Sequence, residues 1–315
     1  MNYDDFNQDK TNEDALTQED LGQENLMSKD EKLRPMLNRL SLSLIIYMFS
    51  SQLIASASMR FLDKAASMLL AVILSLTILV LLQKDKSLKS IFSFKQKDFE
   101  LRDIFFFLGL MSFSTVIFSE LADILINAFN LKSIDVMQEV TGSLNLLMIL
   151  YVIVLGPIIE EIIYRGYLLQ NLRQYSKQAA LILSSFIFAF MHINIEQSIS
   201  VLGISFILNY VVIFYSWKAG LLLHFINNLN ATVLSYLVME KGLDNKLIQI
   251  YSLLLMILMA YSIFTLFKGR FGEIRENLKA DHMDMSYRKK ILFSLPMLIL
   301  ILLYLGQMAL TQIYI

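Results

Sequence analysis

The chain has 315 residues, of which 56% are hydrophobic and only 17% are charged, and its mean hydropathy is +0.56. This composition excludes a soluble globular protein and indicates a polytopic membrane protein. The formal net charge of −1, with no basic soluble region, argues against a nucleic-acid partner. Because the chain has no cysteine, disulfides, thiolate metal sites and cysteine nucleophiles are excluded.

The first 35 residues differ in composition from the rest of the chain. They carry ten acidic and four basic side chains and almost no large apolar clusters. Such a segment cannot bury enough apolar surface to order itself. We therefore predict a disordered acidic cytosolic tail over residues 1–35, and its role as an inert or a partner-binding segment stays open.

Apolar segments of about 20 residues, the length that crosses the hydrocarbon core, follow one another along the rest of the chain. They predict an all-α, polytopic transmembrane helical bundle with eight or nine spans. The third span contains Glu120 and Asp123, which suggests a tilted helix or one that lies partly at the interface. The predicted spans are 40–59, 65–83, 104–127, 144–173, 179–194, 199–217, 219–239, 247–267 and 291–313.

Basic residues concentrate on one side of the topology that these spans imply. They lie between the second and third spans, after the fourth span and before the last one, on the same side as the N-terminal tail. Since cytosolic loops carry an excess of Lys and Arg, we predict a cytosolic N-terminus. The basic block from Lys268 to Lys290 can also be interpreted as a contact with anionic lipid.

Three ionisable residues lie inside the fourth span, in the run Glu160-Glu161-Ile162-Ile163-Tyr164-Arg165. An ionisable residue at bilayer depth costs roughly 3 kcal/mol on insertion scales, so a cluster of three indicates a function. Residues four apart share a helix face, and Glu161 is therefore expected to pair with Arg165. Glu160 is offset around the helix and free to face a different neighbour.

Two of the three histidines also fall inside predicted spans. His192 follows Phe188 by four residues, which places both on one helix face. Counted from the loop near residues 174–179 at 1.5 Å per residue, Glu160 and His192 both lie roughly 20 Å away along antiparallel helices. We therefore expect Glu160 and His192 to be able to meet.

His224 precedes Asn228 by four residues on another predicted span. It lies only about six residues past Trp217-Lys218, or roughly 9 Å from that turn. Either this turn is sunk into the protein or the helices tilt strongly, and both interpretations stay open.

Each polar residue taken alone has a structural interpretation, as a satisfied core histidine, an interhelical asparagine or a buried ion pair. Together, a carboxylate, two imidazoles and a carboxamide on successive core helices are the components of a hydrolytic site.

In these motifs the chain resembles the CPBP family of intramembrane proteases, also called the CAAX protease and bacteriocin-processing or Abi family. The family pattern is EExxxR, then FxxxH, then HxxxN or HxxxD, and all three motifs are complete here, with Gly166 after the arginine. The resemblance implies a catalytic core of four helices over residues 143–240. N-terminal transmembrane helices over 36–142 and C-terminal ones over 241–315 would flank it.

The predicted activity is hydrolysis of peptide bonds in a membrane-associated peptide or protein. Glu160 is the predicted general base for water, with Arg165 placed to neutralise Glu161. His192 is expected to orient that water or to share its proton, as the resemblance also implies.

His224 and Asn228 are expected to polarise the scissile carbonyl and to hold the developing negative charge. A metal alternative stays open, because Glu160, His192 and His224 could ligate Zn²⁺ and leave a position for water. The compact HExxH arrangement is absent, however, and the resemblance favours a glutamate-activated water with no firmly required cofactor.

The cysteine-free chain and its compact spans indicate an integral protein of a bacterial plasma membrane. The resemblance then implies a role in peptide maturation, bacteriocin self-immunity or membrane-protein turnover. A non-catalytic immunity or scaffold protein with the same fold is the main alternative. A transporter is less favoured, because the polar residues occupy one region of the chain and no second copy of it occurs.

Overall fold

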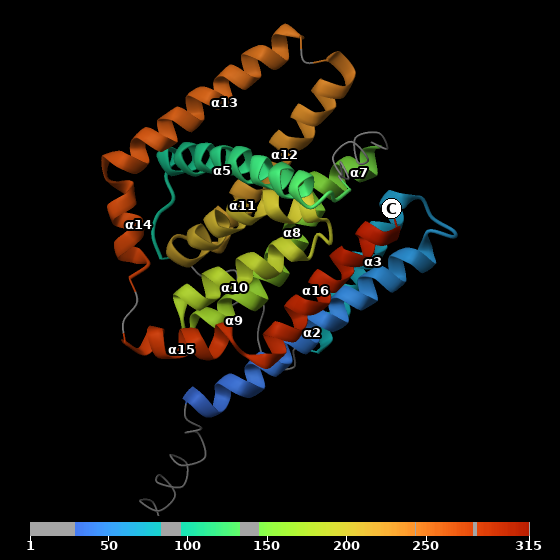
Figure 1. The fold of residues 1–315 in the computed structure, drawn as a ribbon, viewed down its shortest axis with the longest axis vertical. Helices are drawn as coiled ribbons and strands as arrows, with labels where there is room; N and C mark the ends of the chain where they lie inside the picture. Colours follow the sequence, from blue (N-terminus) through green and yellow to red (C-terminus); the bar gives the residue numbers. More distant parts are fainter. Residues whose placement is uncertain (1–28, 83–95, 133–144, 243, 280–281, 315) are drawn as a thin grey trace, which may run out of the picture.

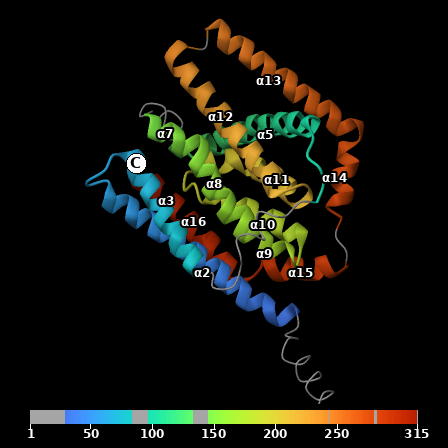
Figure 2. The same ribbon diagram turned by 180° about the vertical axis from the view of Figure 1, so that it is seen from behind.

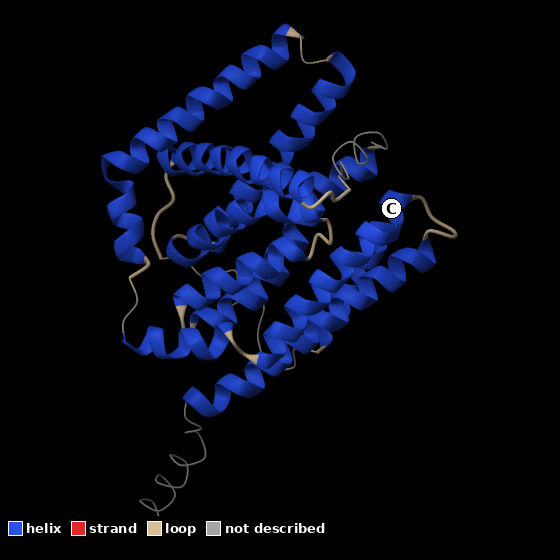
Figure 3. Cartoon of the chain, viewed as in Figure 1, coloured by secondary structure: helices blue, strands red, loops and turns tan. Residues whose placement is uncertain are grey.

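The computed structural model describes residues 29–82, 96–132, 145–242, 244–279 and 282–314. Within these ranges the chain is helical and forms no strand (Figure 3). The predicted all-α bundle is therefore confirmed. Residues 1–28 of the predicted tail lie outside the described residues, whereas residues 29–35 form the first turns of a helix.

Three helices make a layer along one side of the molecule (Figure 1). Helices α2 (Lys29–Ser58) and α3 (Lys64–Leu81) form an antiparallel hairpin, and α16 (Leu295–Tyr314) packs along α2. The first turns of α2 are helical because Leu33 and Leu37 are buried in the core, at 5% and 3% exposure. This burial compensates the chain entropy that leaves a wholly polar tail unfolded.

A central block of helices lies beside this layer (Figures 1 and 2). One continuous helical segment runs through it from Leu146 to Arg173 and alternates between α and π geometry. Its parts are α7 (Leu146–Leu150), η1 (Tyr151–Leu155), α8 (Gly156–Glu160), η2 (Glu161–Leu169) and α9 (Gln170–Arg173). The other helices of the block are α5 (Leu101–Ala128), α10 (Lys177–Phe190), α11 (Ile195–Phe214) and α12 (Trp217–Lys241).

Short turns connect α9 to α10, α10 to α11 and α11 to α12, and a polar cap begins each of the three later helices. The side chains of Ser176, Asn194 and Ser216 accept hydrogen bonds from the backbone N–H three residues on, at 3.0, 2.8 and 3.0 Å. Each cap satisfies one of the backbone donors that a helix start leaves free. The caps therefore fix where the helices that carry the polar motifs begin.

The remaining helices wrap around the outside of the block (Figure 1). They are α13 (Lys246–Thr265), η3 (Leu266–Arg270), α14 (Phe271–Asn277) and α15 (His282–Leu292). Arg270 ties them to the block, because its guanidinium forms an ion pair with Asp103 of α5 and donates to the Tyr215 hydroxyl at 3.0 Å. Tyr215 lies in the turn immediately before α12.

Eight of the described helices are long and apolar enough to cross a membrane. The fifth predicted span, 179–194, is wrong as a full span, because α10 has only 14 residues and ends at Phe190. At 1.5 Å per residue it is about 21 Å long, short of the roughly 30 Å hydrocarbon core. The chain is an integral membrane protein.

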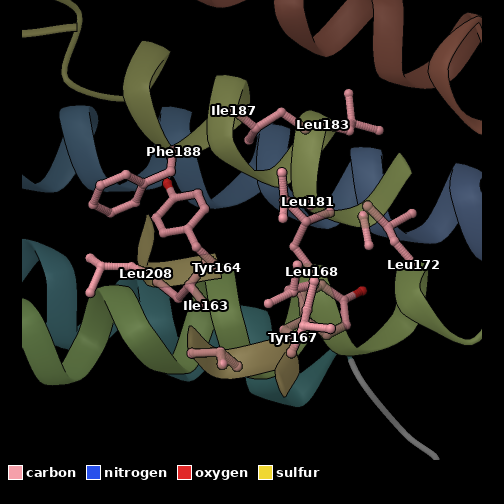
Figure 4. Close-up of a cluster of buried hydrophobic side chains, with 14 of the residues drawn as sticks. Ile163, Tyr164, Tyr167, Leu168, Leu172, Leu181, Leu183, Ile187, Phe188 and Leu208 are labelled. Carbon is pink, nitrogen blue, oxygen red and sulfur yellow. The ribbon is translucent and has the colours of Figure 1, made fainter. Parts of the chain in front are cut away.

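A dense apolar cluster joins the long segment to α10 and α11 (Figure 4). The rings of Tyr164 and Phe188 meet edge to face at 5.4 Å between centroids, and Ile163, Leu168 and Leu208 are fully buried around them. Close packing of this kind holds side chains in single rotamers. The polar motifs therefore project from a rigid support.

Candidate active site

The two glutamates lie where the long segment changes from α to π geometry. Glu160 ends α8, and Glu161 begins η2. The wider π turn changes the backbone hydrogen bonding, and the Glu161 carbonyl accepts a bond of 3.1 Å from the indole N–H of Trp217 on α12. π-helical turns often occur at functional sites.

Glu161 and Arg165 form the predicted ion pair inside the protein. Arg165 Nη1 lies 3.1 Å from Glu161 Oε1, and both side chains have an exposed fraction of 0%. This contact lacks the geometry of a hydrogen bond, so charge attraction holds it. Two unpaired charges at this depth would be strongly unfavourable, and each therefore requires the other.

His224 lies between the two carboxylates. Its Nδ1 is 2.8 Å from Glu161 Oε1, and its Nε2 is 3.5 Å from Glu160 Oε2. Glu160 is thus outside the Glu161–Arg165 pair and faces His224, whose imidazole contacts both carboxylates.

The depth of His224 follows from the position of the turn before α12. Tyr215 and Trp217 have exposed fractions of only 1% and 6%, so the turn is sunk into the protein. Of the two interpretations that the sequence leaves open, the first is the one observed. The short distance from the turn to His224 is then compatible with a site in the interior.

The two glutamates differ in their access to the surroundings. The Glu160 side chain is 24% exposed, whereas Glu161 is fully buried. Glu160 is therefore the carboxylate that a water molecule and a substrate can reach.

His192 lies in the turn after α10. The predicted span 179–194 places it inside a helix, so this part of the prediction is wrong. Its Nδ1 is 3.1 Å from the Phe188 carbonyl and 3.2 Å from that of Ala189, which assigns the ring proton to Nδ1. Nε2 is then an acceptor. The next residue, Ile193, has a φ of 56°, an uncommon conformation for a β-branched residue that clusters at functional sites.

Phe188 connects the two histidines. Its ring lies 5.3 Å from the His192 ring and 5.9 Å from the His224 ring, edge to face in both cases. Glu160 and His192, which depth counting predicted could meet, are not within ion-pair distance of each other in the described structure. The motifs are thus gathered around one aromatic ring.

Asn228 lies one turn beyond His224 on α12, at the edge of the site. Its side-chain amide donates a hydrogen bond of 3.1 Å to the Val152 carbonyl in η1. One of its two N–H groups is thereby used to join α12 to the long segment, and the other remains for a ligand.

Sequence reasoning missed four residues that support this site. Ser205 and Asn209 of α11 bind the Arg165 guanidinium, Trp217 binds the Glu161 carbonyl, and Gly220 lies against the Glu161 carboxylate. The signal for the first two was present, because Ser and Asn four residues apart are polar positions on one face of an apolar helix.

Of the three possible zinc ligands, Glu160 and His224 are adjacent, at 3.5 Å. The described residues contain no group of three or more His, Asp or Glu side chains arranged to hold a metal ion. Glu160, His192 and His224 therefore do not form a preformed three-ligand site.

Comparison with known families identifies the region that carries this site. Residues 142–230 match the family model described as type II CAAX prenyl endopeptidase Rce1-like. This segment is similar to an Rce1-like domain. The resemblance to the CPBP family is thereby confirmed for a part of the chain that includes all three motifs.

The Rce1-like domain covers less than a third of the 315 residues. At the level of the family, it supports an endopeptidase that works within the membrane. Searches of curated proteins and of solved structures gave no significant match.

Gly220 allows the close approach of α12 to the Glu161 side chain, and its replacement by alanine should disturb the site. A Cβ atom there would lie 2.4 Å from Val212 Cγ2 and 3.6 Å from Glu161 Oε2. We expect Gly220→Ala to lower the free energy of unfolding by about 1–3 kcal/mol, as overpacking does, and to displace His224 from Glu161. Unfolding in detergent measures the change.

The double variant Gly220→Ala with Val212→Ala is the matched control, because it removes the methyl group that the new Cβ would meet. It should recover stability relative to Gly220→Ala alone. A double variant that is no more stable than the single one would contradict this packing account.

Proposed function

We propose that the protein is an intramembrane endopeptidase that hydrolyses peptide bonds of a membrane-associated peptide or protein, with Glu160 activating the water. One observation carries the proposal. A partly exposed carboxylate lies 3.5 Å from an imidazole whose other nitrogen is bound by a buried, ion-paired carboxylate. The Rce1-like domain supports the same class of reaction.

Hydrogen-bonding logic assigns the protons in this arrangement. Glu161 Oε1 is an acceptor, so the His224 Nδ1 beside it carries a proton. His224 Nε2 and Glu160 Oε2 can then form a hydrogen bond only when one of these two atoms carries a proton. This pair can accept a proton and return it later, which is what acid–base catalysis of peptide hydrolysis requires.

The proposed steps follow from these positions. Glu160 removes a proton from water as the water oxygen attacks the scissile carbonyl carbon, and the same proton is delivered to the leaving amine nitrogen when the C–N bond breaks. His192 Nε2, an acceptor, orients the water. His224, protonated at Nε2, and the second N–H of Asn228 stabilise the oxyanion.

A substrate survey tests the function directly. Purified protein in lipid nanodiscs is incubated with membrane-anchored peptides that differ in sequence and in whether they carry a C-terminal prenyl group, and new termini are identified by mass spectrometry. We expect cleavage of at least one peptide class near its anchor. Prenylated CAAX peptides are one such class, and unmodified membrane peptides are another.

Removal of metal ions should leave the activity unchanged. Because the proposed steps assign the water to Glu160 and the oxyanion to His224 and Asn228, they require only side chains and water. We expect the initial cleavage rate after dialysis against a strong chelator to stay within about twofold of the untreated rate. A loss of about 10²-fold or more, reversed by Zn²⁺, would instead show that a metal takes part.

The orientation in the membrane belongs to the same proposal. We place residues 143–240 as the catalytic core and the start of α2 in the cytosol of a bacterial cell, with the N-terminal tail before it. In support, α15 and its basic residues lie at the end of the molecule where α2 begins (Figure 1), and Lys290 pairs with Asp30 at 2.8 Å. Cytosolic ends carry such basic residues.

The absence of cysteine makes this orientation simple to test. We expect a membrane-impermeant thiol reagent to label Phe61→Cys, in the exposed turn between α2 and α3, in intact cells. Lys279→Cys, at the opposite end, should be labelled only after the membrane is permeabilised. The reverse pattern would place the N-terminus outside.

A further inference from the structure

The guanidinium of Arg165 is held from the side opposite Glu161 by two residues of α11. Arg165 Nε donates to Asn209 Oδ1 at 3.1 Å, and Nη2 donates to Ser205 Oγ at 3.3 Å. All three side chains have an exposed fraction of 0%. These two bonds use Nε and Nη2, and the third nitrogen, Nη1, faces Glu161.

Asn209 is itself fixed by α10. Its Nδ2 donates to Ser185 Oγ at 2.8 Å and, at 3.4 Å, to the Leu181 carbonyl. Because Nδ2 has these two acceptors, the amide can present only its oxygen to Arg165. Ser185 in turn donates to the Leu181 carbonyl at 2.7 Å, so the hydroxyl that receives the Asn209 N–H is also held.

The flat face of the guanidinium is closed by an aromatic ring. Arg165 Cζ lies 3.9 Å from the centroid of Phe188. A planar guanidinium with one face stacked and one edge bound has little freedom to rotate. Its position is therefore set by α10 and α11, not by Glu161 alone.

We propose that Asn209 is a positioning residue of this active site, which orders Arg165 so that Glu161 holds the His224 imidazole against Glu160. The order of contacts runs from Ser185 through Asn209, Arg165 and Glu161 to His224. This inference rests on the proposed peptidase function, since positioning has meaning only for a reaction at Glu160.

Loss of Asn209 would act through geometry. Without Oδ1, the Arg165 Nε–H has no acceptor in a fully buried site, where an unmet donor is unfavourable, and the guanidinium can turn to find another. Glu161 then moves with it, and His224 Nε2 no longer faces Glu160 at the observed distance. A misplacement of about 1 Å that arises away from the reacting atoms can lower a rate by about 10²-fold.

The test compares three variants on α11, with cleavage of a peptide that the wild type cuts. Asn209→Ala should lower kcat by about 10-fold to 10²-fold with KM within about twofold, because the residue does not touch substrate. Ser205→Ala, which removes the longer bond, should have a smaller effect. Ser198→Ala is the matched control, since Ser198 is a buried polar residue of the same helix that bonds to Met308 instead, and it should leave kcat unchanged.

Repeating the Asn209→Ala substitution in an Arg165→Lys variant distinguishes a positioning role of Asn209 from a general structural role. Lysine cannot make the paired contacts of a guanidinium fork, so the path from Asn209 to Glu161 is already interrupted in that variant. Adding Asn209→Ala there should lower kcat by less than about twofold. A further decrease as large as that in the wild type would overturn the inference.

Failure of this inference differs from failure of the proposed function. If the wild type cleaves and Asn209→Ala cleaves equally fast, the positioning role is wrong and the peptidase function stands. If Asn209→Ala raises KM and leaves kcat unchanged, the residue acts on substrate binding and the inference is also overturned. If the wild type cleaves no peptide, the proposed function itself fails.

Discussion

Glu160→Gln should reduce kcat/KM for peptide cleavage by about 10³-fold, within the 10²- to 10⁴-fold range that a general base contributes. The amide keeps the size of the carboxylate and removes its ability to accept a proton from water. Because the side chain is 24% exposed and glutamine can still hydrogen-bond to the His224 imidazole, the variant should fold and insert normally. Initial rates in nanodiscs measure the effect.

Glu120→Gln is the matched control for this substitution. Glu120 is an exposed carboxylate of α5, inside a candidate membrane span but outside the site. Its replacement removes one intramembrane charge just as Glu160→Gln does, and the rate should stay within about twofold of the wild type. An equal loss in both variants would mean that the charge affects insertion rather than catalysis.

Arg165→Met should lower the free energy of unfolding by about 3–5 kcal/mol. It leaves Glu161 with only the His224 Nδ1–H as a partner in a site with no exposure, and breaking a buried pair from one side has a cost of this order. The same substitution at Arg102, whose ion pair with Glu100 is exposed, should change stability by less than about 1 kcal/mol. Unfolding in detergent, followed by circular dichroism, compares the two variants.

The double variant Arg165→Met with Glu161→Gln tests the reason for that loss. Removing both charges eliminates the unpaired carboxylate, so the double variant should be more stable than Arg165→Met alone. The double variant should nevertheless lack peptidase activity, because an uncharged residue at position 161 no longer holds His224 by charge. If the double variant were less stable than the single one, pairing of charges would not explain the role of Arg165.

Motif spacing alone predicts the local parts of this site. The pairing of Glu161 with Arg165 and of Phe188 with His192 depends only on which residues share a helix face, and both contacts occur. The all-α fold follows equally from composition and from the lengths of the apolar segments. These features are local, so periodicity is sufficient to find them.

Contacts between helices were harder to predict. Depth counting favoured His192 as the partner of Glu160, whereas the structure places His224 there, because the turn before α12 is buried and Gly220 lets α12 approach Glu161. The π geometry of η1 and η2 also shifts side chains in a way that a 3.6-residue period does not describe. The role proposed for Asn209 depends on contacts among three helices, whereas the sequence shows only that it is a polar position on α11.

Cleavage in ¹⁸O-labelled water tests the central claim that Glu160 activates water for peptide hydrolysis. Wild type and Glu160→Gln, reconstituted in parallel, are given the same membrane-anchored peptide, and the products are weighed by mass spectrometry. The account predicts that the wild type places one ¹⁸O in the new C-terminal carboxylate, at a rate about 10³-fold above that of Glu160→Gln. Labelled product formed equally fast by both proteins would contradict it.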